Sequence, residues 1–190
     1  MGVLTTLIII LVVGFFLLQF FWNQRKKISS KVIDLKGLKP ISNFDLNQFY
    51  GRWYEQRRFN SSFEPKELQH VTATYLPFMN NLIKVVNSGW TDQTPSGFKE
   101  AQGTARLTNY PGVAEVSFFP LIESEYVVLY LDDQVLIPGS PNRQYLWLLT
   151  RTPTLFEQNN SSTTLELFQK VALENGYTRD QLQTLQVVKQ

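Results

Sequence analysis

Between residues 41 and 151 the chain is divided into short extended segments, and this pattern constrains the fold more than any other feature. The segments are rich in β-branched and aromatic residues, and turn sequences such as DQTPSG (92–97) and PGSPNR (138–143) separate them. Sheets built from short antiparallel strands avoid exposed edges by forming a sandwich or a closed barrel. We expect strands at 51–59, 69–77, 82–88, 98–107, 113–120, 125–131, 134–137 and 144–151.

Several of these segments alternate, so each predicted strand has two different faces. One face collects small residues from EAQGTA (100–105) and large residues from the segments that follow. This face is either the core of an ordinary sandwich or the lining of a barrel with a cavity, and periodicity alone leaves both open. For a barrel, the candidate ligand-binding residues on this face are Tyr75, Ala101, Gly103, Val116, Phe118, Tyr126, Val128, Tyr130, Tyr145 and Trp147.

One helix is expected after the strands. TTLELFQKVA (163–172) opens with the spacing of a capping box and repeats apolar residues every three or four positions, and Gly176 marks the end. The apolar stripe predicts packing against the outside of the sheet. A second capping box, Thr178-x-x-Gln181, precedes LQVVK (185–189), which predicts a final short strand.

The first 40 residues have a different character. Residues 3–22 contain no charged side chain, and as a helix they would be about 30 Å long, which matches the hydrocarbon core of a bilayer. We expect a transmembrane anchor at 1–24, a basic tether at 25–40 and the folded domain at 41–190. A cleaved secretory signal fits less well, because no basic residue precedes the apolar run and no alanine occurs before Ala73.

Charge and composition exclude several function classes. Residues 1–39 carry six basic side chains against Asp34, whereas residues 40–190 carry twelve basic and fifteen acidic ones, so the body gives no support for nucleic-acid binding. The chain has no cysteine, and His70, which we expect at the surface, is its one histidine. Thiol chemistry, a His-based triad and a His-rich metal site are therefore excluded. We expect no catalytic residue, no metal and no cofactor.

The stretch GRWYEQRRF (51–59) carries charge on both of its predicted faces. Alternation places Trp53, Glu55 and Arg57 on one side of the strand. A lone inward charge is unfavourable unless it is paired. Two interpretations are open: Glu55 pairs with Arg57 or with Arg151, or Glu55 and Arg57 receive the headgroup of a ligand.

The same stretch also resembles a family motif. GRWYE (51–55) resembles the first motif block of the lipocalins, G-x-W-Y/F-E, and YLWLLTRTP (145–153) resembles their third block. Between them HVTATY, VSFFP and EYVVLYLD follow in the same order, although the second block, T-D-Y, is reduced to LDD (131–133). The chain is most similar to the branch with the bacterial outer-membrane lipocalins and apolipoprotein D.

The resemblance implies an all-β fold, an eight-stranded antiparallel up-and-down barrel with one C-terminal α-helix packed outside. In it, Gly51 would let the chain bend at the closed end, Trp53 would plug that end, and Arg151 would lie across the indole ring. These roles are structural. The lumen would bind a small hydrophobic or amphiphilic ligand, of the fatty acid or lysophospholipid type, for storage or transport without catalysis. Two alternatives are an envelope protein with a filled barrel, structural or interacting with partners, and a lipid-modifying enzyme.

Location and assembly are less constrained. Residues 3–22 predict a single pass through a lipid bilayer, and the basic residues after them would leave the domain in the cytoplasm by the positive-inside rule. The family resemblance instead favours a periplasmic or other extracytoplasmic domain, so the side of the membrane stays open. A homodimer is compatible with the resemblance.

Overall fold

The computed structural model describes residues 32–61, 63–79, 81–92, 97–154 and 161–190. Asp34–Gln190 forms one compact unit. The predicted transmembrane helix at residues 3–22 lies outside the described residues. Within the described ranges, no helix is both long enough and apolar enough to cross a membrane.

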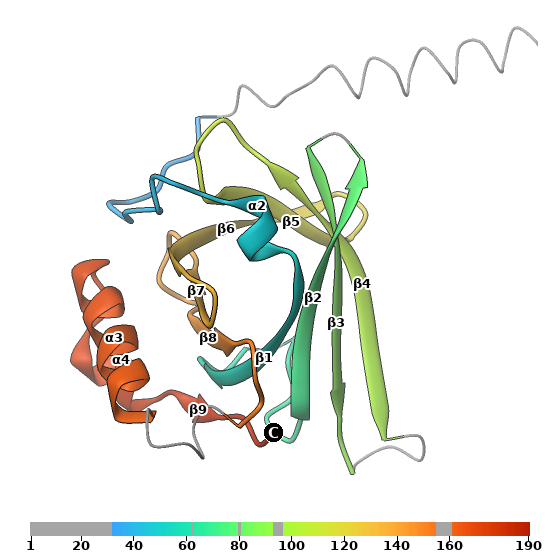
Figure 1. Cartoon of the computed structure of the whole chain (residues 1–190), viewed down its shortest axis with the longest axis vertical. Helices are drawn as coiled ribbons and strands as arrows, with labels where there is room; N and C mark the ends of the chain where they lie inside the picture. The colour runs from blue at the N-terminus through green and yellow to red at the C-terminus, as the bar shows by residue number, and fades with distance from the viewer. Residues whose placement is uncertain (1–31, 62, 80, 93–96, 155–160) are drawn as a thin grey trace, which may run out of the picture. The chain divides into compact units, whose positions relative to one another are not determined.

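The body is a closed antiparallel barrel, as predicted (Figure 1). Each of its eight strands pairs with the next along the chain, and β1 closes the barrel by pairing with both β2 and β8. The turn sequences located all eight strands to within a few residues. The strands are β1 (Gly51–Arg58), β2 (Gln69–Met79), β3 (Leu82–Trp90), β4 (Phe98–Leu107), β5 (Val113–Phe119), β6 (Ile122–Leu131), β7 (Val135–Gly139) and β8 (Trp147–Thr150).

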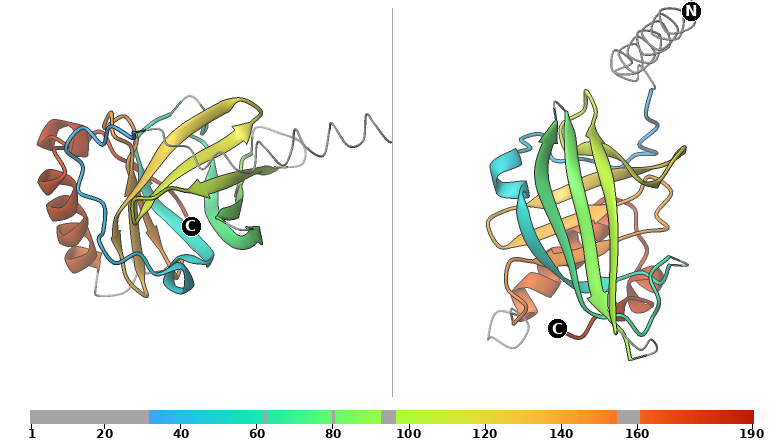
Figure 2. Two further views of the ribbon diagram at one scale, coloured as in Figure 1. Left: turned by 90° about the horizontal axis from the view of Figure 1, so that it is seen from above. Right: turned by 90° about the vertical axis from the view of Figure 1, so that its right-hand side faces the viewer.

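The two ends of the barrel differ. The short helix α2 (Leu46–Phe49) leads directly into β1 and covers one end, and the side chain of Asp45 caps it by accepting a hydrogen bond from the Asn47 amide. Because the strands alternate in direction, the β1–β2, β3–β4, β5–β6 and β7–β8 connections lie at the opposite, open end. There β4 and β5 diverge, since they pair only from Thr104–Leu107 to Ala114–Ser117. Figure 2 (right) shows the β5–β6 hairpin running to the side of β2–β4.

Two β-bulges change which side chains face the lumen. In β1 the pairing with β8 shifts between Glu55 and Arg57, so Arg58 is fully buried while Arg57 is half-exposed. The prediction that Arg57 shares the inward face with Glu55 is therefore wrong.

The second bulge lies in β6, between Val128 and Tyr130. Beyond it Leu131 packs on the core, and the Tyr130 hydroxyl donates to Asp132 at 2.7 Å. The prediction that Tyr130 faces inward with Tyr126 and Val128 is also wrong. Each extra residue reverses the alternation that follows it.

The C-terminal elements lie outside the barrel (Figure 1). Helix α3 (Ser161–Glu174) already includes Thr163, so the predicted first capping box does not mark its start. The apolar stripe is confirmed by the burial of Phe168 and Ala172. The second predicted capping box is also confirmed, with Thr178 and Gln181 capping α4 (Arg179–Gln183).

The predicted final strand forms as β9 (Gln186–Val187), which pairs with Arg57 and Arg58. Past Tyr54, strand β1 separates from β2, and the residues after β9 occupy the space between them. The Val188 amide donates to the Gln56 carbonyl at 3.0 Å, and the His70 amide donates to the Lys189 carbonyl at 2.7 Å. His70 itself is exposed, as expected.

Candidate ligand-binding lumen

The closed end is held by contacts between Trp53 and Arg151. Trp53 is fully buried and donates its indole N–H to the Phe49 carbonyl at 2.9 Å. The guanidinium carbon of Arg151 lies 3.6 Å from the centroid of the Trp53 ring, and its N–H groups donate to three backbone carbonyls around α2 and β1. Gly51 has a φ of 100°, which favours glycine. The geometry is the one predicted for a barrel floor.

Directly above this floor the barrel is filled by apolar side chains, including Phe49, Tyr75 and Val128. A small cavity remains among them, lined also by Val116 and Tyr126. The space in it open to a water-sized sphere is about 10 Å³, roughly enough for one water molecule. A ligand therefore does not fit this lower part unless side chains move.

Two of the predicted inward tyrosines bind one another. The hydroxyls of Tyr75 and Tyr126 lie 2.8 Å apart, and the Tyr75 ring packs 4.2 Å from that of Phe49. Burial raises the pKa of both phenols, so both are neutral at physiological pH. The pair satisfies two hydroxyls in an otherwise apolar region.

An aromatic wall continues from Tyr126 to the open end. The rings of Tyr126 and Trp147 are 6.4 Å apart, those of Trp147 and Tyr145 are 5.7 Å apart, and Phe63 follows 5.2 Å from Tyr145. Tyr126, Tyr145 and Trp147 are half-buried, whereas Phe63 is 58% exposed. These four residues, the aromatic wall, offer a graded apolar surface from the interior to the mouth.

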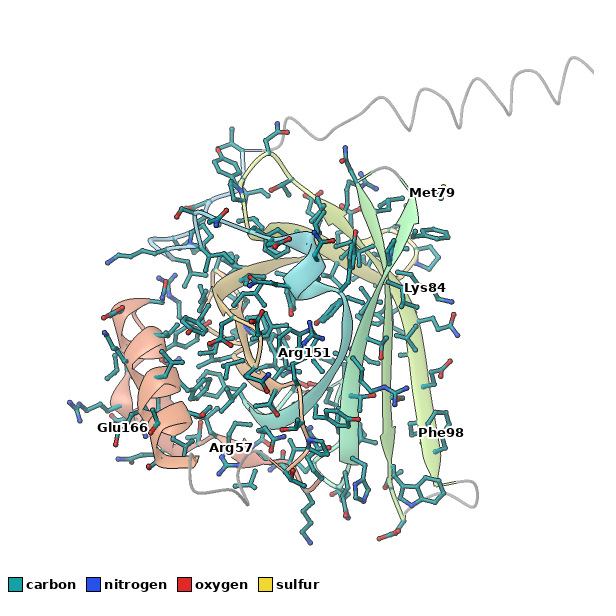
Figure 3. The ribbon with its side chains drawn as sticks, in the orientation of Figure 1. Arg57, Met79, Lys84, Phe98, Arg151 and Glu166 are labelled. Atoms are coloured by element: carbon teal, nitrogen blue, oxygen red, sulfur yellow. The ribbon has the colours of Figure 1, made fainter. Side chains whose placement is uncertain are left out.

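A buried ion pair lies beside this wall. Nη1 of Arg58 donates to Oε1 of Glu55 at 2.6 Å, and Nη2 donates to the Pro65 carbonyl at 2.8 Å. Both side chains are almost completely buried. The predicted pairing of Glu55 with Arg57 or Arg151 is therefore wrong, because the bulge in β1 gives the inward position to Arg58. In Figure 3, Arg57 lies toward the C-terminal helices and away from β3 and β4.

Glu64, from the β1–β2 connection, completes an acidic cluster with Glu55 and Arg58. Its carboxylate accepts a hydrogen bond from the Trp147 indole N–H at 3.2 Å. A side-chain hydrogen bond also links the Glu64 and Glu55 carboxyl groups. Burial raises the pKa of Glu55 to about 8, with the charge of Glu64 adding to the rise and Arg58 opposing it. Burial also raises the pKa of Glu64. One shared proton and one guanidinium together neutralise the two carboxyl groups.

The predicted wall of small residues does not leave the space that its composition suggested. A Cβ atom on Gly103 would meet the Ser117 carbonyl oxygen at 2.5 Å and the Phe118 ring at 2.8 Å. Gly103 therefore permits close packing of β4 on β5. Ala101 is exposed on the inward face of β4, where it pairs with Asn87 of β3. Within the described residues the buried Oδ1 atom of Asn87 has no hydrogen-bond partner.

Sequence reasoning missed three polar residues of this lumen. Asn87 continues the alternation of Ile83 and Val85, so that pattern alone would have indicated it. Strict alternation would place Arg58 on the outer face, because a bulge has no reliable sequence signal, and Glu64 lies in a connection without periodicity. In the described part of the chain, no three His, Cys, Asp or Glu side chains form a group that could hold a metal ion.

A closed eight-stranded antiparallel barrel with an external C-terminal helix and a lumen lined by aromatic residues defines a class of ligand-binding proteins. Residues 44–187 match the family model described as "Lipocalin-like domain". The chain belongs to the lipocalin family, as its motifs predicted, and lipocalins in general bind small hydrophobic ligands.

The relatives place it in the predicted branch. The chain is 36% identical to outer membrane lipoprotein Blc of Vibrio cholerae over 152 residues, which cover 77% of this chain and 85% of that protein. It is 30% identical to temperature-induced lipocalin-1 of Arabidopsis thaliana, covering 75% and 78%. Mouse apolipoprotein D is also 30% identical, covering 60% and 64%.

Solved structures agree on the fold. The cockroach allergen Per a 4 superposes with a TM-score of 0.58 at 19% identity, covering 82% of this chain and 96% of that chain. Apocrustacyanin C2 gives 0.59 at 12% identity, covering 76% and 78%.

Proposed function

We propose that the protein stores or transports a single-chain amphiphile of the fatty acid or lysophospholipid type in its lumen. The observation that carries the proposal is the aromatic wall, which continues from the hydrogen-bonded Tyr75–Tyr126 pair through half-buried rings to the exposed Phe63 at the mouth. Each methylene group buried there contributes about 0.8 kcal/mol, so one alkyl chain offsets the cost of association.

The ligand would lie in the upper half of the barrel, because the lower half is packed. Inward side chains that keep accessible surface mark its path. Ala101 faces it from β4, and the acidic cluster that includes Glu55 lies beside it. The proposed contacts are Ala101, Val116, Phe118, Tyr126, Tyr145 and Trp147, with Tyr75 and Val128 at the bottom of the path.

We also propose that residues 3–22 tether the barrel to a membrane. The support is the sequence alone, an uncharged run long enough to span a bilayer. The names of the relatives are consistent with it, since Blc of Vibrio cholerae is called an outer membrane lipoprotein. An extracytoplasmic barrel beside a bilayer would be close to a source of amphiphiles.

A filled barrel with a structural role is the second candidate, and the packing above Trp53 favours it. The two functions differ in what the lumen contains. The purified full-length chain would be extracted with organic solvent, and the released lipids would be identified by mass spectrometry. Recovery of one amphiphile in a stoichiometric amount would support ligand binding. Recovery of detergent and bulk lipid alone would support the filled barrel.

A matched pair of variants distinguishes lipid bound in the lumen from lipid bound to the membrane segment. Ala101→Trp places an indole on the inward face of β4, whereas Gln102→Trp places the same group on its outer face. Ala101→Trp should abolish co-purification and the binding of a dansyl-labelled fatty acid, and Gln102→Trp should leave both unchanged. Equal retention in the two variants would show that the lipid is not in the barrel.

A further inference from the structure

We propose that Glu64, held by Trp147 beside the Glu55–Arg58 ion pair, makes the lumen select amphiphiles whose headgroup carries an ammonium or quaternary ammonium group over amphiphiles that end in a carboxylate. This inference rests on the proposed binding function and narrows its ligand class. Glu64 acts as a specificity-determining residue at the side of the aromatic wall.

The charged groups of the cluster differ in how accessible they are to a ligand. Arg58 is fully buried, and both of its terminal nitrogens are engaged, one by Glu55 and the other by the Pro65 carbonyl. Its buried Nε atom has no hydrogen-bond partner within the described residues, and its side chain exposes no surface to a ligand. Glu64 is half-buried, and its carboxylate is fixed against the edge of Trp147. A ligand at the aromatic wall approaches the carboxylate first.

Aromatic rings lie beside that carboxylate. Trp147 uses its N–H edge to bind Glu64, while Tyr126 and Tyr145 lie on either side of it at 6.4 and 5.7 Å. The negative faces of tryptophan and tyrosine rings attract cations, most strongly where water is excluded. A carboxylate joined to several aromatic rings is the combination that recognises ammonium and quaternary ammonium groups.

A carboxylate ligand would instead need an accessible cation near the aromatic wall. Lys84 points away from the barrel (Figure 3), and Arg57 lies on the other face of β1. Lys99 does share the inward face of β4, but it is exposed at the outer end of that strand, opposite Gly89. A fatty acid headgroup beside Trp147 would meet the accessible carboxylate of Glu64 before the fully buried guanidinium of Arg58.

A cationic ligand should also displace a proton. Glu55 and Glu64 share one proton, and the charged group facing them is Arg58, since the nearby phenols of Tyr75 and Tyr126 are neutral. A positive headgroup at Glu64 stabilises a second carboxylate, so the proton on Glu55 is released to solvent. A carboxylate ligand has the opposite effect and keeps the proton bound.

The test uses the full-length chain and three probes with the same twelve-carbon chain: dodecyltrimethylammonium, monolauroylglycerol and dodecanoate. Each would displace a neutral fluorescent probe from the lumen below its critical micelle concentration, and the signal of Ala101→Trp would be subtracted. We expect dodecyltrimethylammonium to bind about tenfold more tightly than dodecanoate, as expected for a difference of about one charge interaction. Equal or tighter binding of dodecanoate would overturn the inference.

Variants assign the effect to one residue. Glu64→Gln keeps the shape and should remove most of the preference, whereas Glu67→Gln, an exposed carboxylate of the same connection, should preserve it. If Lys99→Gln rather than Glu64→Gln changes the preference, the selectivity belongs to the mouth and the inference is wrong. If none of the three probes displaces the fluorophore, the proposed binding function itself fails.

A measurement on the unmodified protein does not depend on how Glu64→Gln folds. Calorimetric titration with dodecyltrimethylammonium in buffers of different ionisation enthalpy counts the protons released. We expect release of a substantial fraction of one proton at pH 7 and none with monolauroylglycerol. The absence of any buffer dependence, with binding intact, would refute the coupling between the headgroup and the acidic cluster.

Discussion

Arg151 covers the indole ring of Trp53 at 3.6 Å and at the same time ties together the backbone of α2 and β1. The charge is thus placed on an aromatic face and on backbone carbonyl oxygens that accept its N–H groups. Arg151, directly after β8, therefore stabilises the floor in two ways. It makes a cation–π contact, and it donates hydrogen bonds to the backbone carbonyls of Gln48, Tyr50 and Arg52.

Replacing Arg151 should destabilise the fold. Arg151→Ala removes the contact with the Trp53 ring and leaves the carbonyls of Tyr50 and Arg52 without this donor, so we expect a loss of about 2 kcal/mol or more in the free energy of unfolding. Chemical denaturation with urea measures this loss. Arg179→Ala, at an exposed position of α4, should change stability by less than about 0.5 kcal/mol. Similar values for both variants would contradict the role of Arg151.

Gly103 provides a test of packing between β4 and β5. Gly103→Ala places a methyl group 2.5 Å from the Ser117 carbonyl oxygen, and we expect it to cost about 1–3 kcal/mol in unfolding free energy. Phe118→Leu would relieve the contact with the ring but not that with the backbone. The double variant should therefore remain less stable than Phe118→Leu alone, and full rescue would show that only the ring matters.

Sequence patterns were sufficient for the architecture because the turn signals are strong. DQTPSG separates β3 from β4, and β7 ends within PGSPNR, at Gly139. The motif around Trp53 and the basic residue at 151 likewise predicted the closed end. These features depend on residue types with few alternative uses, namely glycine, proline and tryptophan.

The polar part of the lumen could not be predicted in the same way. Arg57 and Tyr130 were predicted on the wrong face of their strands, and each of them follows a bulge. Neither bulge contains a glycine that would indicate it. Glu64 lies in a connection, where no periodicity fixes the direction of a side chain. The directions of these side chains therefore depend on the three-dimensional path of the chain, which strict alternation cannot predict.

The tyrosine pair offers a double-mutant cycle. Tyr75→Phe and Tyr126→Phe each break the 2.8 Å hydrogen bond between the hydroxyls, and we expect each to cost about 1 kcal/mol. The double variant should cost clearly less than the sum, because no buried hydroxyl is then left without a partner. Strictly additive losses in thermal or urea unfolding would mean that the hydroxyls do not interact in solution.

The acidic cluster should make stability depend on pH. The pKa of Glu55 is raised from 4.5 to about 8 by burial, so between these values the folded state holds a proton that the unfolded chain releases. This contribution is complete below about pH 4.5 and is lost as the pH rises through 8, at up to about 1.4 kcal/mol per pH unit. Glu55→Gln, which stays neutral, should remove it. Urea unfolding of both proteins at pH 5.5 and 7.5 measures the effect: relative to the variant, the unmodified protein should lose about 2 kcal/mol over this interval. Parallel pH profiles for the two proteins would show that Glu55 carries no proton in the folded state.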